Sequence, residues 1–156
     1  MAKSRKRYPE GLTIQHVSTY LVREATAASA ETVSDDTDAA QMFREVFDYD
    51  HADREIFAAL ALNTKNRVLG AWQVSVGSLN ASIVHPRELF RAAVMLGAAS
   101  IVVGHNHPSG DPTPSGADIQ LTRRLVKAGD VLGIEVLDHI VVGDTSHVSL
   151  RDQGLM

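Results

Sequence analysis

Two histidines follow directly on a short apolar segment, and their spacing limits how this part of the chain can fold. Residues 100–104 (Ser-Ile-Val-Val-Gly) are predicted to form a buried β-strand, and His105 and His107 come at its end. In extended backbone, side chains two positions apart point to the same side. Pro108 disfavours helical backbone at His107, which keeps the pair extended. Both imidazoles are therefore expected to face one point, as ligands of a metal ion do.

A carboxylate from the next predicted element completes a ligand set. A stiff loop over 109–114 leads into a helix predicted over 115–132, and Asp118 lies in its first turn. Two histidines and one carboxylate form a ligand set of catalytic zinc sites, in which the fourth position stays open for water. The alternative is structural, because Ser115-x-x-Asp118 is also typical of a capping box that stabilises a helix start. One residue can serve both roles.

The remaining pattern alternates strands and helices. A first helix opens at 35–38 and is expected to present one apolar side, made of Ala39, Met42, Phe43, Val46 and Phe47. Asn63-Thr64-Lys65-Asn66 is a hairpin signal between two strands. Strands are predicted at 12–22, 55–62, 68–76, 100–104, 134–142 and 147–150, with further helices at 86–96 and 115–132. This order predicts an α/β fold with a mixed β-sheet flanked by helices.

The spacing His105-x-His107-x7-Ser115-x2-Asp118 matches the JAMM (MPN+) zinc metalloprotease motif at each position. Residues 105–115 resemble the RadC branch of that superfamily, as do residues 85–93 and 137–143. The resemblance runs from about residue 54 to the C-terminus, within a single domain expected over 11–156 after a flexible basic tail at 1–10. It implies a three-layer sandwich of the JAMM/MPN (cytidine-deaminase-like) type.

The resemblance implies a role for each matching residue. His105, His107 and Asp118 would bind Zn²⁺, and Ser115 would hydrogen-bond the zinc-bound water or the oxyanion that forms from it. The family also uses an upstream glutamate that takes a proton from this water. Glu55 fits that position because it leads into an apolar strand that ends in a turn.

Glu88 competes with Glu55 for the role of general base because it is nearer to the histidines in sequence. It follows Pro86 at the start of a predicted helix, where an acid is favourable without any catalytic role. Glu55 heads the apolar residues 56–62, where an acid is costly unless it is paired or used. Glu55 is therefore preferred as the general base. The alternative for Glu55 is that it has no catalytic role and lies in solvent at the strand end, beside Arg54.

These roles predict metal-assisted hydrolysis of a peptide or isopeptide bond in a peptide or protein substrate. The chain has no cysteine, which excludes a thiol nucleophile. Two other classes stay open: a DNA repair or recombination accessory of the RadC type, and a non-catalytic MPN scaffold. Longer RadC proteins carry a helix-hairpin-helix region, but no Gly-rich hairpin motif precedes Glu55 here. The net charge of −4 does not favour nucleic acid as a partner either.

Other features of the sequence bear on environment and on neighbours of the site. No apolar run is long enough to span a membrane and no secretory signal is present, so a cytoplasmic protein is expected; the oligomeric state stays open. His139, after Asp138 in an apolar strand, is interpreted as a buried, hydrogen-bonded histidine, with support of the metal ligands as the alternative. Asn106 and Ser109 are expected to line the substrate groove.

Overall fold

In the part of the chain that the structure describes, five strands form one mixed sheet between the helices. The computed structural model describes residues 32–77 and 84–156. The strands are β1 (Ile56–Leu62), β2 (Val68–Val76), β3 (Ser100–Asn106), β4 (Glu135–Val142) and β5 (His147–Ser149), in the order β2-β1-β3-β4-β5. Only the β3–β4 pair is parallel among these described strands, and the other neighbours are antiparallel. The predicted mixed sheet is confirmed.

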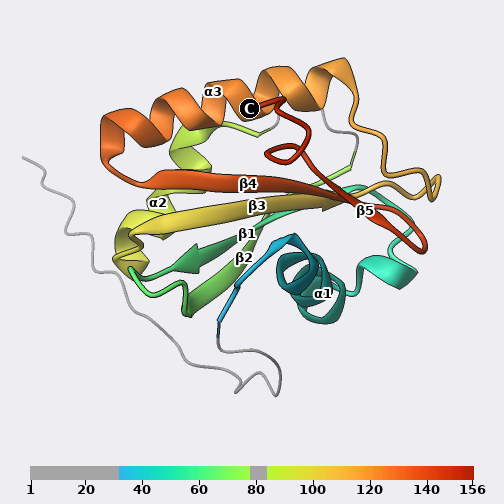
Figure 1. Cartoon of the computed structure of the whole chain (residues 1–156), viewed down its shortest axis with the longest axis horizontal. Helices are drawn as coiled ribbons and strands as arrows, with labels where there is room; N and C mark the ends of the chain where they lie inside the picture. Colours follow the sequence, from blue (N-terminus) through green and yellow to red (C-terminus); the bar gives the residue numbers. More distant parts are fainter. Residues whose placement is uncertain (1–31, 78–83) are drawn as a thin grey trace, which may run out of the picture.

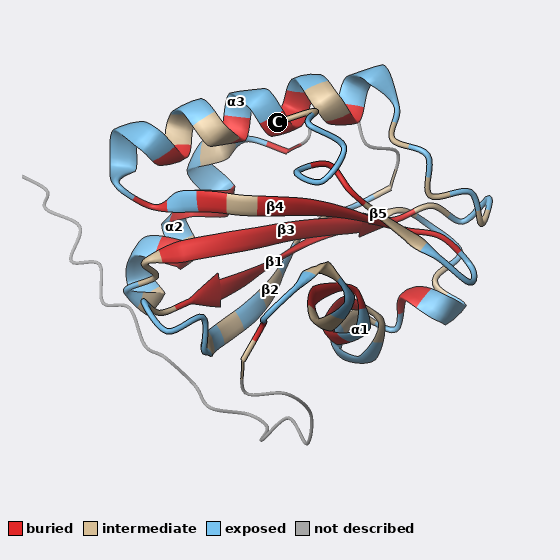
Figure 2. Cartoon of the chain, in the orientation of Figure 1, coloured by how far each residue is buried: buried red, intermediate tan, exposed pale blue. Residues whose placement is uncertain are grey.

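Helices cover both faces of this sheet, as Figure 1 shows. The helix α1 (Asp36–Phe47) packs on one face, and α2 (Pro86–Leu96) and α3 (Gly116–Leu132) pack on the other. Two separate apolar clusters result, one around Phe43 and Leu60 and one around Phe57 and Leu125. Because both faces are covered, β1 and β3 are buried almost throughout (Figure 2) and read as continuous apolar runs. The three-layer α/β arrangement agrees with the sequence prediction.

Alternate residues of β3 belong to different layers. Val102 lies in the α1 cluster, whereas Ile101 and Val103 lie in the α2/α3 cluster. By the same alternation, Gly104 faces α1 and His105 faces α3. A Cβ atom added at Gly104 would lie 2.6 Å from the Phe43 ring, so only glycine permits this approach of α1. The end of β3 is thus held closely on one face while it presents a polar side chain on the other.

Most predicted elements lie where the sequence placed them, with differences at their ends. The strand predicted at 100–104 extends to Asn106, because His105 and Asn106 continue the pairing with β4. Val46 is 44% exposed, so it does not join the apolar face of α1 as expected. A short 3₁₀ helix, η1 (Tyr49–His51), was not predicted. The predicted strand at 12–22 and the tail at 1–10 lie outside the described residues.

Membrane insertion was not expected from the sequence. Within residues 32–77 and 84–156, no helix combines the length and the apolar character that crossing a bilayer requires.

Replacing Gly104 should destabilise the fold. We expect Gly104→Ala to lower the free energy of unfolding by about 1–3 kcal/mol, because the new methyl group collides with the Phe43 ring. Urea denaturation measures this change. The matched control is Gly116→Ala, where nothing lies within 4 Å of the added Cβ and no loss is expected. Equal stability of the two variants would contradict the packing argument.

Candidate metal centre

Three side chains converge where β3 ends and α3 begins. The Nε2 atoms of His105 and His107 lie 2.9 Å apart. Asp118 Oδ1 lies 3.5 Å from His105 Nε2, and its Oδ2 lies 3.7 Å from His107 Nε2. His105 and Asp118 are buried and His107 is partly buried. The structure therefore brings together all three residues that the sequence predicted as metal ligands, with ligand atoms within 4.8 Å of one another.

The hydrogen bond of His107 fixes which nitrogen it offers. His107 Nδ1 lies 2.7 Å from the main-chain carbonyl oxygen of Asp111. Because a carbonyl oxygen only accepts, Nδ1 carries the hydrogen, and Nε2 of the neutral ring presents a lone pair to His105. Two imidazole nitrogens at this distance repel each other unless a hydrogen or a metal ion lies between them, and the adjacent carboxylate favours a cation there. The donor set of two imidazoles and one carboxylate fits Zn²⁺.

Burial and neighbouring charges set the protonation of the three groups. Burial lowers the pKa of His105 well below its usual value, and the neighbouring His139 lowers it further. The contact with Asp118 raises the pKa of His107. Burial by itself would raise the pKa of Asp118, but the two histidines and Ser115 outweigh it, so this pKa lies below its usual range. Asp118 is therefore a carboxylate at neutral pH, as metal binding requires.

Ser115 and Asp118 also form the predicted capping box. The main-chain N–H of Asp118 donates to Ser115 Oγ (3.1 Å), and the N–H of Ser115 donates to Asp118 Oδ2 (2.7 Å). These bonds hold the Asp118 carboxylate in the first turn of α3, where it can face the histidines. The structural and the metal-binding interpretations of this residue pair therefore coexist.

The cluster opens into a hollow of about 300 Å³. Glu55, which directly precedes β1, lines this hollow together with His107, Pro108, Ser109, Ser115 and Asp118. The charge of Glu55 contributes to the raised pKa of His107. Glu88 lies on α2, half exposed, within 3.3 Å of Arg87 and 3.6 Å of Arg91. The geometry thus places Glu55 at the site and pairs Glu88 with surface arginines.

Asn106 ties the segment that carries Glu55 to β3. Its side-chain Oδ1 accepts a hydrogen bond from Ile56 N (2.7 Å), and its Nδ2 donates to the carbonyl oxygen of Arg54 (3.0 Å). Both partners are chain neighbours of Glu55. Asn106 is buried, so the expectation that it lines the groove is wrong. Ser109 does line the hollow, as expected.

The prediction that His139 is a buried, hydrogen-bonded histidine is confirmed, whereas Thr122 was not predicted to lie near the site. Both are buried, and His139 contacts His105 on one side and Thr122 on the other. Burial lowers the pKa of His139 to about 4. A signal for Thr122 existed in its spacing: it lies four residues after Asp118 on the buried stripe of α3, between the apolar Leu121 and Leu125.

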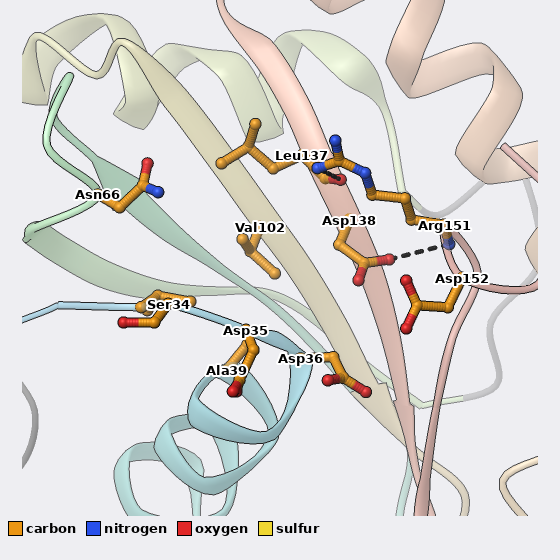
Figure 3. A pocket seen from close by; sticks show the side chains of 11 residues that line it. Ser34, Asp35, Asp36, Ala39, Asn66, Val102, Leu137, Asp138, Arg151 and Asp152 are labelled. Carbon is orange, nitrogen blue, oxygen red and sulfur yellow. Dashed lines mark hydrogen bonds between the residues drawn. The ribbon is translucent and has the colours of Figure 1, made fainter.

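A second hollow of similar size lies on the α1 face of the sheet (Figure 3). It is lined by several acids, and protein groups already pair with the carboxylates of Asp35, Asp36 and Asp138. Asp138 accepts hydrogen bonds from Ser149 Oγ (2.6 Å) and Arg151 N (3.1 Å), and Asp35 caps α1 by accepting from Asp38 N. In the described part of the chain, the group at His105, His107 and Asp118 is the one with the composition and spacing of a metal site.

The fold and the site define the class of the protein. It is an α/β protein with a mixed sheet between helical layers and a candidate metal centre at the end of β3. Residues 33–155 match the family described as the RadC-like JAB domain, and the chain belongs to this family.

Bacterial relatives support this membership. The chain is 59% identical over 104 residues to a UPF0758 protein of Desulforamulus reducens, a match that covers 67% of this chain and 46% of the relative. It is 55% identical over 124 residues to a UPF0758 protein of Desulforudis audaxviator, covering 80% and 53%. The chain spans about half the length of these curated relatives. Their names state no activity.

Zinc binding should depend on His107. We expect the parent protein to hold stoichiometric zinc and His107→Ala to lose most of it, because one of three ligands is removed. Metal analysis of the purified proteins after dialysis measures this. His147→Ala is the matched control, since His147 pairs with Asp36 at 2.9 Å and is not one of the three clustered residues. Full zinc retention in His107→Ala would contradict the assignment.

Zinc affinity should fall as the pH is lowered. The pKa of His107 is raised above its ordinary value of about 6.5. As the pH falls, the ring therefore takes up a proton at a higher pH than an ordinary histidine does. Zinc must displace this proton, and we expect about tenfold weaker binding per pH unit below the pKa of His107. Asp118 stays ionised in this range because its pKa is lowered. Competition with a chelator at constant ionic strength measures the effect, and a pH-independent affinity would contradict it.

Proposed function

We propose that this domain is a zinc-dependent hydrolase that cleaves peptide or isopeptide bonds in a peptide or protein substrate. The observation that carries the proposal is the composition of a single hollow. Its wall combines the candidate metal ligands His107 and Asp118 with a hydroxyl from Ser115 and a carboxylate from Glu55. A metal, a general base and a donor to an oxyanion are the groups that hydrolysis of an amide needs.

His105, His107 and Asp118 would hold the zinc ion. When bound, the ion supplies Lewis acidity, which makes a water molecule nucleophilic at neutral pH and polarises a carbonyl group. Glu55 accepts a proton from the attacking water, whose oxygen bonds to the carbonyl carbon. As the C–N bond breaks, Glu55 donates that proton to the leaving amine nitrogen.

Ser115 is suited to stabilise the negative oxygen that forms on the substrate. Its Oγ accepts a hydrogen bond from Asp118 N, so its own hydroxyl hydrogen is available to donate into the hollow that it lines. The capping box fixes the position of this hydroxyl at the start of α3. A donor held in place before the reaction stabilises a developing charge without reorganisation.

Asn106 and the strand pairing support the position of the base. Glu55 lies between the two main-chain groups that Asn106 binds, and its own carbonyl oxygen accepts from Gly77 N at 2.9 Å. The backbone of Glu55 is therefore held on both sides while its side chain faces the hollow. The completeness of this set favours a hydrolase over a non-catalytic scaffold.

The test separates the base from the metal site. We expect Glu55→Gln to retain stoichiometric zinc and to lose turnover by about 10²–10⁴-fold, because the amide cannot accept the proton. A panel of fluorogenic peptides and of isopeptide-linked peptides measures turnover, with a chelator abolishing it. Glu88→Gln is the matched control and should cleave at the parental rate. Parental turnover in Glu55→Gln would show that the base is another group.

A further inference from the structure

A chain of three hydrogen bonds runs behind His105, on the side away from the hollow. The carbonyl oxygen of Asp118 lies 2.7 Å from Thr122 Oγ1. Thr122 Oγ1 lies 2.6 Å from His139 Nδ1, and His139 Nε2 lies 2.8 Å from His105 Nδ1. Thr122, His139 and His105 are all fully buried. Bulk water therefore has no part in this chain.

The direction of each hydrogen bond follows from the carbonyl group at one end. A carbonyl oxygen only accepts, so Thr122 uses its single hydrogen to donate to Asp118 O. Thr122 Oγ1 can then only accept from its other neighbour, and the hydrogen between Thr122 and His139 must belong to His139 Nδ1. The carbonyl group of Asp118 thus determines, through the hydroxyl of Thr122, that His139 donates from Nδ1.

The direction of the hydrogen bond between His139 and His105 follows in the same way. His139 is fully buried and its two ring nitrogens contact a hydroxyl and another imidazole, so a charged ring would be costly. With Nδ1 protonated, the neutral ring of His139 has a lone pair on Nε2. His105 Nδ1 must therefore donate to it, which leaves His105 Nε2 with a lone pair toward His107 and Asp118.

We propose that Thr122 and His139 are positioning residues that fix the tautomer and the ring plane of His105, so that Nε2 is always the nitrogen offered to the metal. The inference rests on the proposed zinc site and assigns a role to two residues that do not reach the hollow. A partner that accepts the second N–H of a ligating histidine is a general device for orienting it.

Packing holds the same two rings in place. The ring of Phe57 stacks on His105 with centroids 6.2 Å apart and an interplanar angle of 19°. It meets His139 edge-on, at 5.4 Å and 77°. Neither imidazole can therefore rotate freely into another hydrogen-bonding arrangement.

The position of His139 depends on an irregular pairing of β4. Ile101 pairs with Val136, but Val102 pairs with Asp138, so Leu137 is an extra residue. Val136 belongs to the α2/α3 cluster, and Leu137 packs against the α1 cluster. The extra residue reverses the alternation that follows, so that His139 rather than Ile140 faces α3.

The test compares two substitutions of Thr122 in the full chain. Thr122→Val keeps the shape but removes the hydroxyl, and we expect zinc affinity to fall about 10–100-fold. Thr122→Ser keeps the hydroxyl and should retain the parental affinity. Competition with a chromophoric chelator measures both. Parental zinc affinity in Thr122→Val would overturn the proposal.

The matched control is a buried hydroxyl outside the chain of bonds. Ser149 Oγ donates to Asp138 at 2.6 Å, and Asp138 lines the hollow on the α1 face. Ser149→Ala should lower thermal stability and leave zinc affinity unchanged. If Ser149→Ala weakened zinc binding as much as Thr122→Val, the effect would reflect general loosening of the fold, and the proposal would fail.

A spectroscopic measurement tests the tautomers without any substitution. Nitrogen NMR of the histidine rings in the zinc-loaded protein should find Nδ1 protonated in both His105 and His139. Protonation of His139 at Nε2 would overturn the proposal. These readouts do not depend on turnover: a zinc-loaded protein that cleaves no substrate contradicts the proposed function, whereas the affinities and tautomers decide the inference.

Discussion

Two imidazole nitrogens that lie 2.9 Å apart with little access to water repel each other unless a hydrogen or a metal ion lies between them. In this protein the approach of His105 to His107 is imposed from both sides. β3 fixes the backbone, Asp111 engages the far nitrogen of one ring, and His139 engages that of the other. The carboxylate of Asp118 then supplies the negative charge that a shared cation requires. The remainder of the site is arranged around this contact.

The layers of the fold explain why such a contact can persist. Gly104 allows α1 to approach β3 on one face, and the next residue, His105, lies under α3 on the other. Asp118 lies in the first turn of α3, where one of its oxygens accepts the capping hydrogen bond, and it also completes the cluster. Loss of Asp118 would therefore weaken the start of the helix as well as the metal centre. Folding and metal binding draw on the same residue.

Local spacing made part of the site predictable from the sequence. His105 and His107 are two residues apart at the end of a strand, and Asp118 lies in the first turn of the next helix. A single loop between the strand and the helix is therefore enough to bring the three side chains together. Both helices on that face and the central strands were predictable for a similar reason, because the apolar periodicity of the helices and the continuous apolar runs of the strands are local properties.

Contacts between distant segments were harder to predict. Asn106 binds main-chain groups about fifty residues away, and those groups carry no side-chain signal. Thr122 reads as an ordinary residue within an apolar stripe, and His139 as a core histidine, until α3 is placed against β4. The choice between Glu55 and Glu88 depended in the same way on which segment the fold brings to the end of β3.

The extra residue in β4 makes the register of this strand part of the site. If Leu137 took a regular place in the pairing with β3, the two sides of the strand would be exchanged beyond that point. Asp138 and Ile140 would then face α3 in place of His139, although no residue of the centre had been altered. The bulge at Leu137 therefore decides which side chain lies behind the first metal-binding histidine.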